Sequence, residues 1–78
     1  MQNKNEILNR LGLRIKQIRV QKGITQSELA RLSDKERQNI YRLEKGKINP
    51  SVHFLYEISD ALSIDISELF KNSTEEDF

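Results

Sequence analysis

Apolar residues recur along this chain at the spacing of α-helices, and no stretch shows the sustained alternation of a β-strand. Over residues 6–21 the apolar positions fall at i, i+3, i+7 and i+10, which is one face of a helix formed by Leu8, Leu11, Ile15 and Ile18. Lys22 and Gly23 then supply a helix stop. Gly12 inside this first helix costs about 1 kcal/mol relative to alanine, and a close crossing by another helix would explain its presence.

Capping signals predict where the next two helices begin and end. Thr25 and Glu28 form a capping box, in which each side chain bonds a free backbone amide of the helix start. The second helix should run to about residue 32, and its expected buried residues are Leu29, Ala30 and Leu32. A third helix follows the joint at residues 33–36 and runs to Lys45, where Gly46 closes it.

Two further helices complete the predicted fold. Pro50 restricts the residue before it to extended backbone, and Ser51 is a sound N-cap for a fourth helix. The inner stripe of that helix is Phe54, Leu55, Ile58, Ala61 and Leu62. Asp65 and Glu68 match a second capping box, which opens a short fifth helix. We therefore predict one all-α domain over residues 6–72, between a flexible N-terminus (1–5) and an acidic tail (73–78).

Length and composition exclude several classes of function. A chain of 78 residues is one domain and too small for a multi-layer enzyme core. The absence of cysteine excludes disulfide scaffolds, thiolate nucleophiles and Cys-ligated zinc, and the single histidine, His53, has no metal-ligand spacing around it. No run approaches the roughly 20 apolar residues needed to cross a bilayer, and no leader peptide is evident. We expect a soluble, cytoplasmic protein without catalysis, cofactor, metal or membrane contact.

The net charge of +1 conceals an asymmetry between the two halves. Residues 1–50 hold twelve Lys and Arg against five Asp and Glu, a balance of +7, whereas residues 51–78 hold one Lys against seven acids, a balance of −6. Such a split favours a polyanionic partner on the basic side. A solvated surface with uneven charge explains the composition equally well.

The predicted third helix has two different faces. Ile40 and Leu43 point inward with Glu44 beside them, and the opposite face carries Arg37, Gln38, Tyr41, Arg42 and Lys45. Arginine can bind guanine and glutamine can bind adenine through two hydrogen bonds each, and lysine suits a phosphate. Spacing alone favours an ordinary solvated face. However, a short preceding helix joined by about four residues must cross this one steeply, as in a helix-turn-helix.

Three motifs carry a resemblance to a known family. Residues 22–30 resemble the K-G-x-T/S-Q-x-E-L-A opening of the Cro/phage-repressor (XRE) helix-turn-helix family. Residues 40–51 resemble its I-S-x-x-E-x-G-x-x-x-P-S block, and residues 61–70 are similar to its closing A-L-G-V-S-x-x-E-L-F. The motifs stand in the family's order and the resemblance spans about residues 11–70. It implies a five-helix, lambda-repressor-like DNA-binding domain with the helix-turn-helix at helices two and three.

The resemblance also implies roles for the matching positions. The expected base-reading residues lie on the third helix and are Glu36, Arg37, Gln38, Tyr41 and Arg42. The expected phosphate-contacting residues lie at the start of the second helix and before the fourth, and are Thr25, Gln26, Lys45, Lys47, Asn49 and Ser51. Arg19 and Glu44 match a structural ion pair. The pattern supports this pair, because Glu44 borders a buried face and needs a cation, although a surface Glu44 without a fixed partner is the alternative.

The chain departs from the family pattern at the joint between helices two and three. Asp34 and Lys35 stand where glycine and an apolar residue are usual. Asp34 tolerates left-handed backbone, and Lys35 must lay its stem over the core. Glu36 is a poor N-cap, so a helix start directly after Asp34 is an open alternative. Glu36 could read a cytosine amino group or form a salt bridge that orients Arg37.

Exposed apolar residues indicate where a second copy would bind. Leu13 should be exposed, but the fifth helix is the better candidate for a dimer seam, with Ile64, Ile66, Phe70 and the more distant Phe78. A two-fold dimer would place two recognition helices about 34 Å apart, on half-sites one DNA turn apart.

The function predicted from these features is a sequence-specific transcriptional regulator of double-stranded DNA. It would bind a palindromic operator as a homodimer, like small Cro-type repressors or the controller proteins of restriction–modification systems, and RNA polymerase is a further possible partner. The acidic half should face away from DNA. Two alternatives stay open: an antitoxin whose acidic C-terminal half meets a toxin, and a protein-interaction module that keeps the fold without reading bases.

Overall fold

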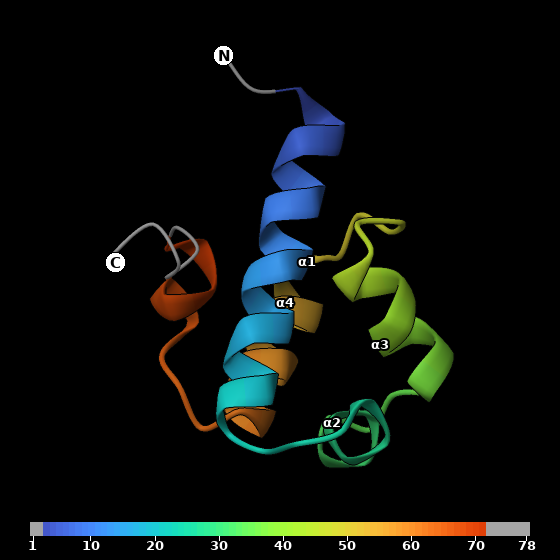
Figure 1. Cartoon of the computed structure of the whole chain (residues 1–78), viewed down its shortest axis with the longest axis vertical. Helices are drawn as coiled ribbons and strands as arrows, with labels where there is room; N and C mark the ends of the chain where they lie inside the picture. The colour runs from blue at the N-terminus through green and yellow to red at the C-terminus, as the bar shows by residue number, and fades with distance from the viewer. Residues whose placement is uncertain (1–2, 72–78) are drawn as a thin grey trace.

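The computed structural model describes residues 3–71 (Figure 1), and within them the chain forms four α-helices followed by a 3-10 helix. The elements in order are α1 (Lys4–Gln21), α2 (Gln26–Leu32), α3 (Arg37–Glu44), α4 (Val52–Ala61) and η1 (Ile66–Phe70). No strand occurs between residues 3 and 71, so the predicted all-α class is confirmed. The fifth helix is a 3-10 helix. The predicted acidic tail, residues 73–78, lies outside the described residues.

The first helix begins two residues earlier than predicted. Asn3 and Glu6 form a capping box, since Asn3 Oδ1 accepts a hydrogen bond from the Glu6 amide at 2.8 Å and Glu6 Oε1 accepts one from the Asn3 amide at 3.1 Å. The apolar pattern begins only at Ile7 and Leu8, so a helix start predicted from that pattern falls too late. Residues 4 and 5 belong to α1 rather than to an N-terminal extension.

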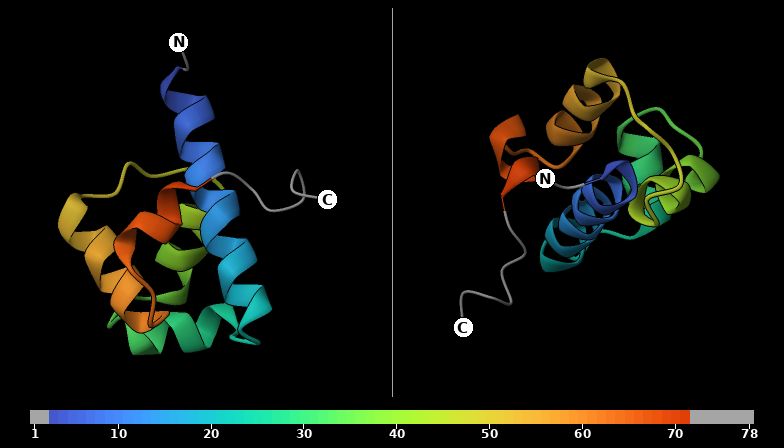
Figure 2. Two further views of the ribbon diagram at one scale, coloured as in Figure 1. Left: turned by 90° about the vertical axis from the view of Figure 1, so that its left-hand side faces the viewer. Right: turned by 90° about the horizontal axis from the view of Figure 1, so that it is seen from above.

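All five helices contribute to one core, which contains Ile15, Ile18, Leu29, Ala30, Ile40, Leu43, Leu55, Ile58, Leu62 and Leu69. In the ribbon views α1 stands in the centre with α3 on one side and η1 on the other, and α2 crosses the base (Figures 1 and 2). The prediction that Leu32 is buried was wrong, because this residue is 48% exposed at the end of a helix of only two turns. Leu13 is exposed, as predicted.

Gly12 lies where α1 crosses the end of α3, and this explains a glycine within a helix. A Cβ atom at this position would lie 2.5 Å from the backbone carbonyl oxygens of both Leu43 and Glu44. Real Cβ atoms do not approach oxygen so closely, so any larger residue would push the two helices apart. The lack of a side chain at Gly12 therefore allows the end of α3 to approach the backbone of α1 this closely.

A buried arginine that the sequence analysis did not single out ties η1 to α1. Arg14 Nε donates to the backbone carbonyl of Glu68 at 2.8 Å, and Arg14 Nη2 lies 3.3 Å from Glu68 Oε1. The predicted capping box at the start of η1 is therefore wrong in its second half. Asp65 does cap this turn, but through the amide of Ser67 at 3.0 Å, and Glu68 turns to Arg14 and Lys71 instead.

Within residues 3–71 no helix is long and apolar enough to span a bilayer.

Candidate nucleic-acid interface

The joint between α2 and α3 is a tight turn held by local hydrogen bonds. Ser33 Oγ donates to the Leu29 carbonyl at 2.7 Å, and the Lys35 amide donates to the Ala30 carbonyl at 2.8 Å. Asp34 adopts a φ of +58°, so it takes the left-handed conformation that the sequence analysis allowed for it. The capping box at the start of α2 is also confirmed, with Thr25 Oγ1 accepting from the Glu28 amide at 3.0 Å.

The third helix begins at Arg37, with Glu36 in the N-cap position and no side-chain cap. The alternative start directly after Asp34 is therefore wrong, because Glu36 has extended backbone with φ −89° and ψ 149°. Glu36 is exposed and makes no ion pair with any described residue. The salt bridge considered for orienting Arg37 does not form.

Lys35 secures the joint to α4. Its Nζ atom lies 2.5 Å from Glu57 Oε1 and 4.8 Å from the centre of the Phe54 ring, so its stem crosses the core edge as predicted. The bond from Lys35 lowers the pKa of Glu57 below its usual value, and His53, 3.4 Å from the other carboxylate oxygen, adds to this. The His53 side chain is 84% exposed, as expected of a solvated imidazole.

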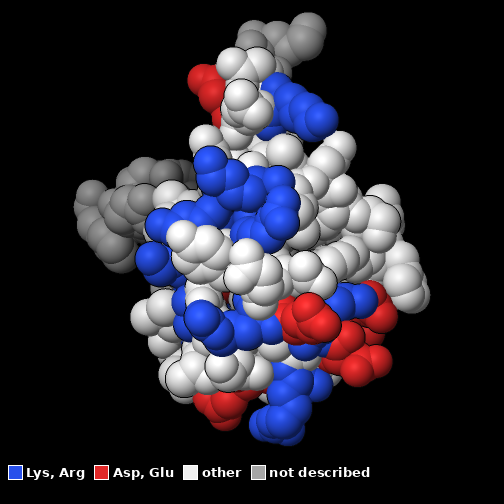
Figure 3. Space-filling model, turned by 90° about the vertical axis from the view of Figure 1, so that its right-hand side faces the viewer, with Lys and Arg blue, Asp and Glu red and all other residues white. Residues whose placement is uncertain are grey.

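The two predicted faces of α3 are both present. Ile40 and Leu43 are buried, whereas the opposite face exposes Arg37, Gln38, Tyr41 and Arg42. The helix ends at Glu44, one residue earlier than predicted, and Lys45 is its exposed C-cap. Viewed from the side of α3, Lys and Arg side chains gather over the middle of the face, and acidic side chains lie mostly toward its lower right (Figure 3). Lys45 Nζ stands 5.9 Å from the centre of the Tyr41 ring. This face combines hydrogen-bond donors, an amide and an aromatic ring.

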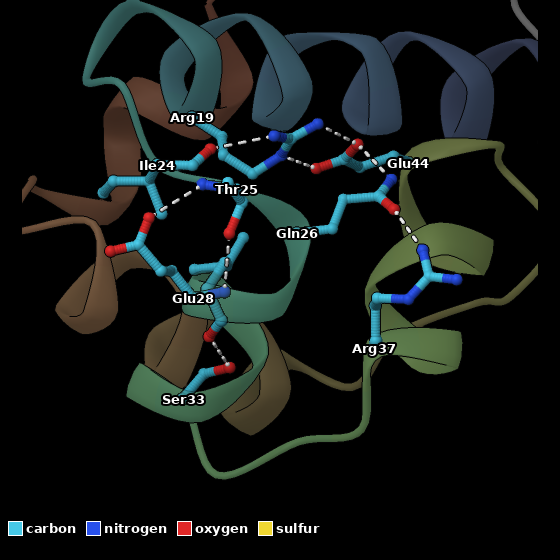
Figure 4. A network of polar contacts seen from close by, with 9 residues as sticks. Arg19, Ile24, Thr25, Gln26, Glu28, Ser33, Arg37 and Glu44 are labelled. Atoms are coloured by element: carbon cyan, nitrogen blue, oxygen red, sulfur yellow. Dashed lines mark hydrogen bonds and ion pairs between the residues drawn. The ribbon is translucent and has the colours of Figure 1, made fainter.

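The ion pair between Arg19 and Glu44 is confirmed. Arg19 Nε donates to Glu44 Oε2 at 2.6 Å and Nη2 donates to Oε1 at 3.0 Å, and both side chains are at least nine-tenths buried. Arg19 Nη1 donates to the carbonyl of Ile24 at 2.9 Å. The guanidinium thus joins the end of α1, the loop before α2 and the end of α3 (Figure 4).

Gln26 has two partners that the sequence analysis did not anticipate. Its Nε2 atom donates to Glu44 Oε1 at 3.1 Å, and its Oε1 atom accepts from Arg37 Nη1 at 3.2 Å. Figure 4 shows the amide between these two side chains. The pattern of residue types could not reveal this, because positions 26, 37 and 44 are brought together only by the crossing of α2 and α3.

The remaining candidates lie on the segment that leads from α3 into α4. Lys45, Lys47, Asn49 and Ser51 are all exposed. The Lys47 amide donates to the Arg42 carbonyl at 2.9 Å, and Gly46, at φ +71°, makes the turn. Ser51 caps α4 as predicted, accepting from the Phe54 amide at 3.0 Å. Among residues 3–71, no group of three His, Asp or Glu side chains lies close enough to hold a metal ion.

Two short helices joined by a tight turn, the second presenting an exposed cationic face, define a helix-turn-helix domain. Residues 15–69 match the helix-turn-helix family HTH_3, and the chain belongs to this XRE-type family. Its members are DNA-binding transcription regulators and not enzymes.

Several relatives are similar over most of the chain. An HTH-type transcriptional regulator of Archaeoglobus fulgidus is 41% identical over 63 residues, which cover 81% of this chain and 90% of that protein. The regulator SinR of Bacillus subtilis (strain 168) is 36% identical over 70 residues, covering 86% of this chain and 63% of SinR.

Solved structures with the same fold include two restriction–modification controller proteins. C.AhdI from Aeromonas hydrophila superposes with a TM-score of 0.80 and 35% identity, covering 81% of this chain and 96% of that one. The wild-type controller C.Esp1396I has a TM-score of 0.76 and 31% identity, with coverage of 82% and 83%.

Proposed function

We propose that this chain is a sequence-specific regulator of transcription that acts in the cytoplasm and binds double-stranded DNA as a homodimer on a palindromic operator. The observation that carries this proposal is the exposed face of α3, which offers Arg37, Gln38, Tyr41 and Arg42 on a helix whose inner side is buried. The close crossing at Gly12 and the buried Arg19–Glu44 pair hold that helix rigidly against α1. A rigid, cationic helix that protrudes from the domain suits the major groove.

The proposed contacts divide into two kinds. The base-reading residues are Arg37, Gln38, Tyr41 and Arg42, because these side chains project from the helix itself, and Glu36, the N-cap, stands at the edge of the set. Lys45, Lys47, Asn49 and Ser51, together with Thr25 and Gln26, would contact the phosphate backbone. The phosphate assignment is supported by the exposure of Lys45, Lys47, Asn49 and Ser51, which lie on one continuous segment. Phosphate contacts set position and affinity, and base contacts set specificity.

Phe70 is the most accessible of the three residues predicted for the dimer seam that the structure describes, and the fourth, Phe78, lies outside the described residues. Phe70 is 62% exposed, whereas Ile64 and Ile66 are partly buried and pack against the core. Phe70 and the half-exposed Ile7 border an open hollow of about 200 Å³ between α1 and η1. η1 lies on the side of α1 away from α3 (Figure 1), so a second copy bound at the hollow between α1 and η1 would leave the base-reading face uncovered.

The acidic half of the chain supports an orientation on DNA. Asp65 caps η1 and Glu68 lies within it, and η1 stands on the side of α1 away from α3 (Figure 1), while Asp60 is near the end of α4. Phosphates would repel these carboxylates, so α2 and α3 would face the duplex and η1 would point outward. Occupancy of the operator would regulate the gene. Whether the gene is repressed or activated would depend on the position of the operator relative to RNA polymerase.

The test compares variants of the two kinds of contact. Arg42→Ala should cost about 1–3 kcal/mol of binding to the operator and relax specificity at one base pair, whereas Lys45→Ala should weaken binding to all sequences and reduce the salt slope by about 1. Fluorescence anisotropy with operator and unrelated duplexes measures both effects. If Arg37→Ala and Arg42→Ala leave binding and regulation intact, the chain is an interaction module that does not read bases. Capture of a toxin in place of DNA would favour the antitoxin function.

A further inference from the structure

The described residues that line the hollow between α1 and η1 are apolar or basic. Leu69 belongs to the buried core, whereas Ile7 and Phe70 are 49% and 62% exposed. Two further exposed residues of the lining, Arg10 and Lys71, are basic, and no acidic residue between 3 and 71 lines the hollow. Apolar surface open to water beside two cations favours an occupant that combines an apolar group with negative charge.

The volume of the hollow limits the size of that occupant. It measures about 200 Å³, whereas sites for drug-sized ligands have about 300–1,000 Å³ and enclose most of the ligand. One aromatic ring therefore suits the hollow better than a whole small molecule. Such a ring would contact apolar residues of both α1 and η1, and its neighbours in the sequence would lie over the basic edge.

The basic edge is only partly neutralised by the described residues. Glu68 Oε2 lies 2.8 Å from Lys71 Nζ, and Glu68 Oε1 lies 3.3 Å from Arg14 Nη2. The hydrogen bond from Lys71 is the main cause that lowers the pKa of Glu68, so this carboxylate is ionised near neutral pH. One carboxylate thus meets two cations, and Arg10, one helical turn before Arg14, adds a third positive charge.

The chain itself contains a segment with the required chemistry. Residues 72–78 read N-S-T-E-E-D-F, so three acidic residues directly precede Phe78. This segment follows Lys71, which already lines the hollow. Seven residues span at most about 25 Å when fully extended, so Phe78 can reach back into the hollow. A short tether also gives the ring a higher local concentration than a second copy has in solution.

We propose that the segment 72–78 binds across this hollow in the same copy of the chain, with the Phe78 ring inside it and the preceding carboxylates beside Arg10 and Lys71. The hollow is also the surface proposed for a second copy, so the bound segment competes with dimer formation. It thereby raises the protein concentration at which the dimer forms. This consequence rests on the proposed dimeric function, whereas the contact within one copy does not.

Tryptophan fluorescence of the full chain tests the contact. The sequence contains no tryptophan, so Phe78→Trp introduces a single aromatic reporter. Its emission should lie at shorter wavelength than that of an exposed indole, and it should do so at every protein concentration, as binding within one copy requires. Arg10→Glu in this background should shift the emission to longer wavelength. Lys16→Glu changes an exposed base of α1 that does not line the hollow, and should leave the emission unchanged.

Sedimentation equilibrium of wild type and Phe78→Ala tests the competition. Both hollows of a two-fold dimer must be open, so a segment that fills its hollow half of the time raises the dimer Kd about 4-fold. Phe78→Ala should therefore lower the Kd by at least about this factor. Melting curves verify that each variant folds, and Asp60→Ala, which removes an exposed acid of α4, is the control for changes outside the hollow.

The other outcomes would overturn the inference. Emission from position 78 equal to that of an exposed indole would show that the segment does not fill the hollow. An unchanged Kd would show that it does not compete, and a higher Kd would show that it bridges two copies. None of these results affects the proposed reading of DNA. If neither wild type nor Phe78→Ala dimerises at any concentration, the proposed homodimer fails instead, and the fluorescence still decides whether the contact exists.

Discussion

Arg19 and Glu44 meet through two parallel hydrogen bonds inside the domain, with Nε to Oε2 at 2.6 Å and Nη2 to Oε1 at 3.0 Å. The pair joins the last turn of α1 to the last residue of α3. Its position connects the stability of the fold to the placement of the exposed helix. A charge-assisted pair with both oxygens satisfied is stable in such a buried place, whereas either charge alone is not.

Glu44→Ala should therefore destabilise the domain strongly. Removing one partner leaves the Arg19 guanidinium buried without its carboxylate, and breaking a buried pair in this way costs about 3–5 kcal/mol. Thermal and urea denaturation measure the loss, with Glu36→Ala as the control, since it removes an exposed carboxylate that forms no ion pair with any residue between 3 and 71. An unchanged melting curve for Glu44→Ala would refute the structural role of the pair.

Gly12→Ala should destabilise the protein even though alanine favours helix formation. Its Cβ atom would lie 2.5 Å from two backbone oxygens of α3, and backbone cannot move aside as a flexible side chain can. We expect a loss of about 1–3 kcal/mol, typical of overpacking. Lys16→Ala, at an exposed position of α1, is the control for helix propensity. Equal or greater stability of Gly12→Ala would show that α1 and α3 are not in such close contact.

The Lys35–Glu57 pair should make stability sensitive to acid. The hydrogen bond from Lys35 lowers the pKa of Glu57 in the folded chain. The stabilisation is therefore present above the pKa of the unfolded chain, about 4.3, and is lost as the pH falls through the lower folded pKa. As the pH falls below about 4.3, the melting temperature of wild type should fall more steeply than that of Glu57→Gln. Parallel curves for the two proteins would contradict this account. Lys35→Met removes the main partner and leaves His53 beside Glu57, so its curve should lie between those of wild type and Glu57→Gln.

Phe70→Asp should weaken self-association without unfolding the chain. The Phe70 side chain is largely exposed at the hollow between α1 and η1, so a carboxylate there meets water in the monomer and an apolar surface in the dimer. Sedimentation velocity should show a shift toward monomer. Tyr56→Asp changes another half-exposed apolar residue, on α4, and should leave the association unchanged. Identical association of Phe70→Asp and wild type would exclude this face as the dimer seam.

Much of the fold could be predicted because local signals and periodicity agree. Thr25 and Ser51 cap their helices with the hydrogen bonds that their residue types predict. The stripe of α4 faces the core, with Leu55, Ile58 and Leu62 buried. The start of α1 was harder to predict. Its capping box, formed by Asn3 and Glu6, consists of polar residues and precedes the first apolar position of the helix.

The features that escaped prediction depend on contacts between distant parts of the chain. Glu68 has Arg14 as a neighbour only after η1 packs against α1, so the capping role suggested by its spacing from Asp65 was wrong. Gln26 stands between Glu44 and Arg37 only because α2 and α3 cross there. The residue types at the interface followed from the family pattern, but the hydrogen bonds that orient them required the three-dimensional arrangement.

Selection of binding sites from random duplex DNA, followed by a salt titration of the enriched site, tests the central claim most directly. The account predicts a palindrome whose half-sites lie about one helical turn apart. It also predicts that log K falls linearly with log salt, with a slope of about −0.9 for each phosphate contacted. No enriched palindrome together with a flat salt dependence would contradict the proposal that α3 reads DNA.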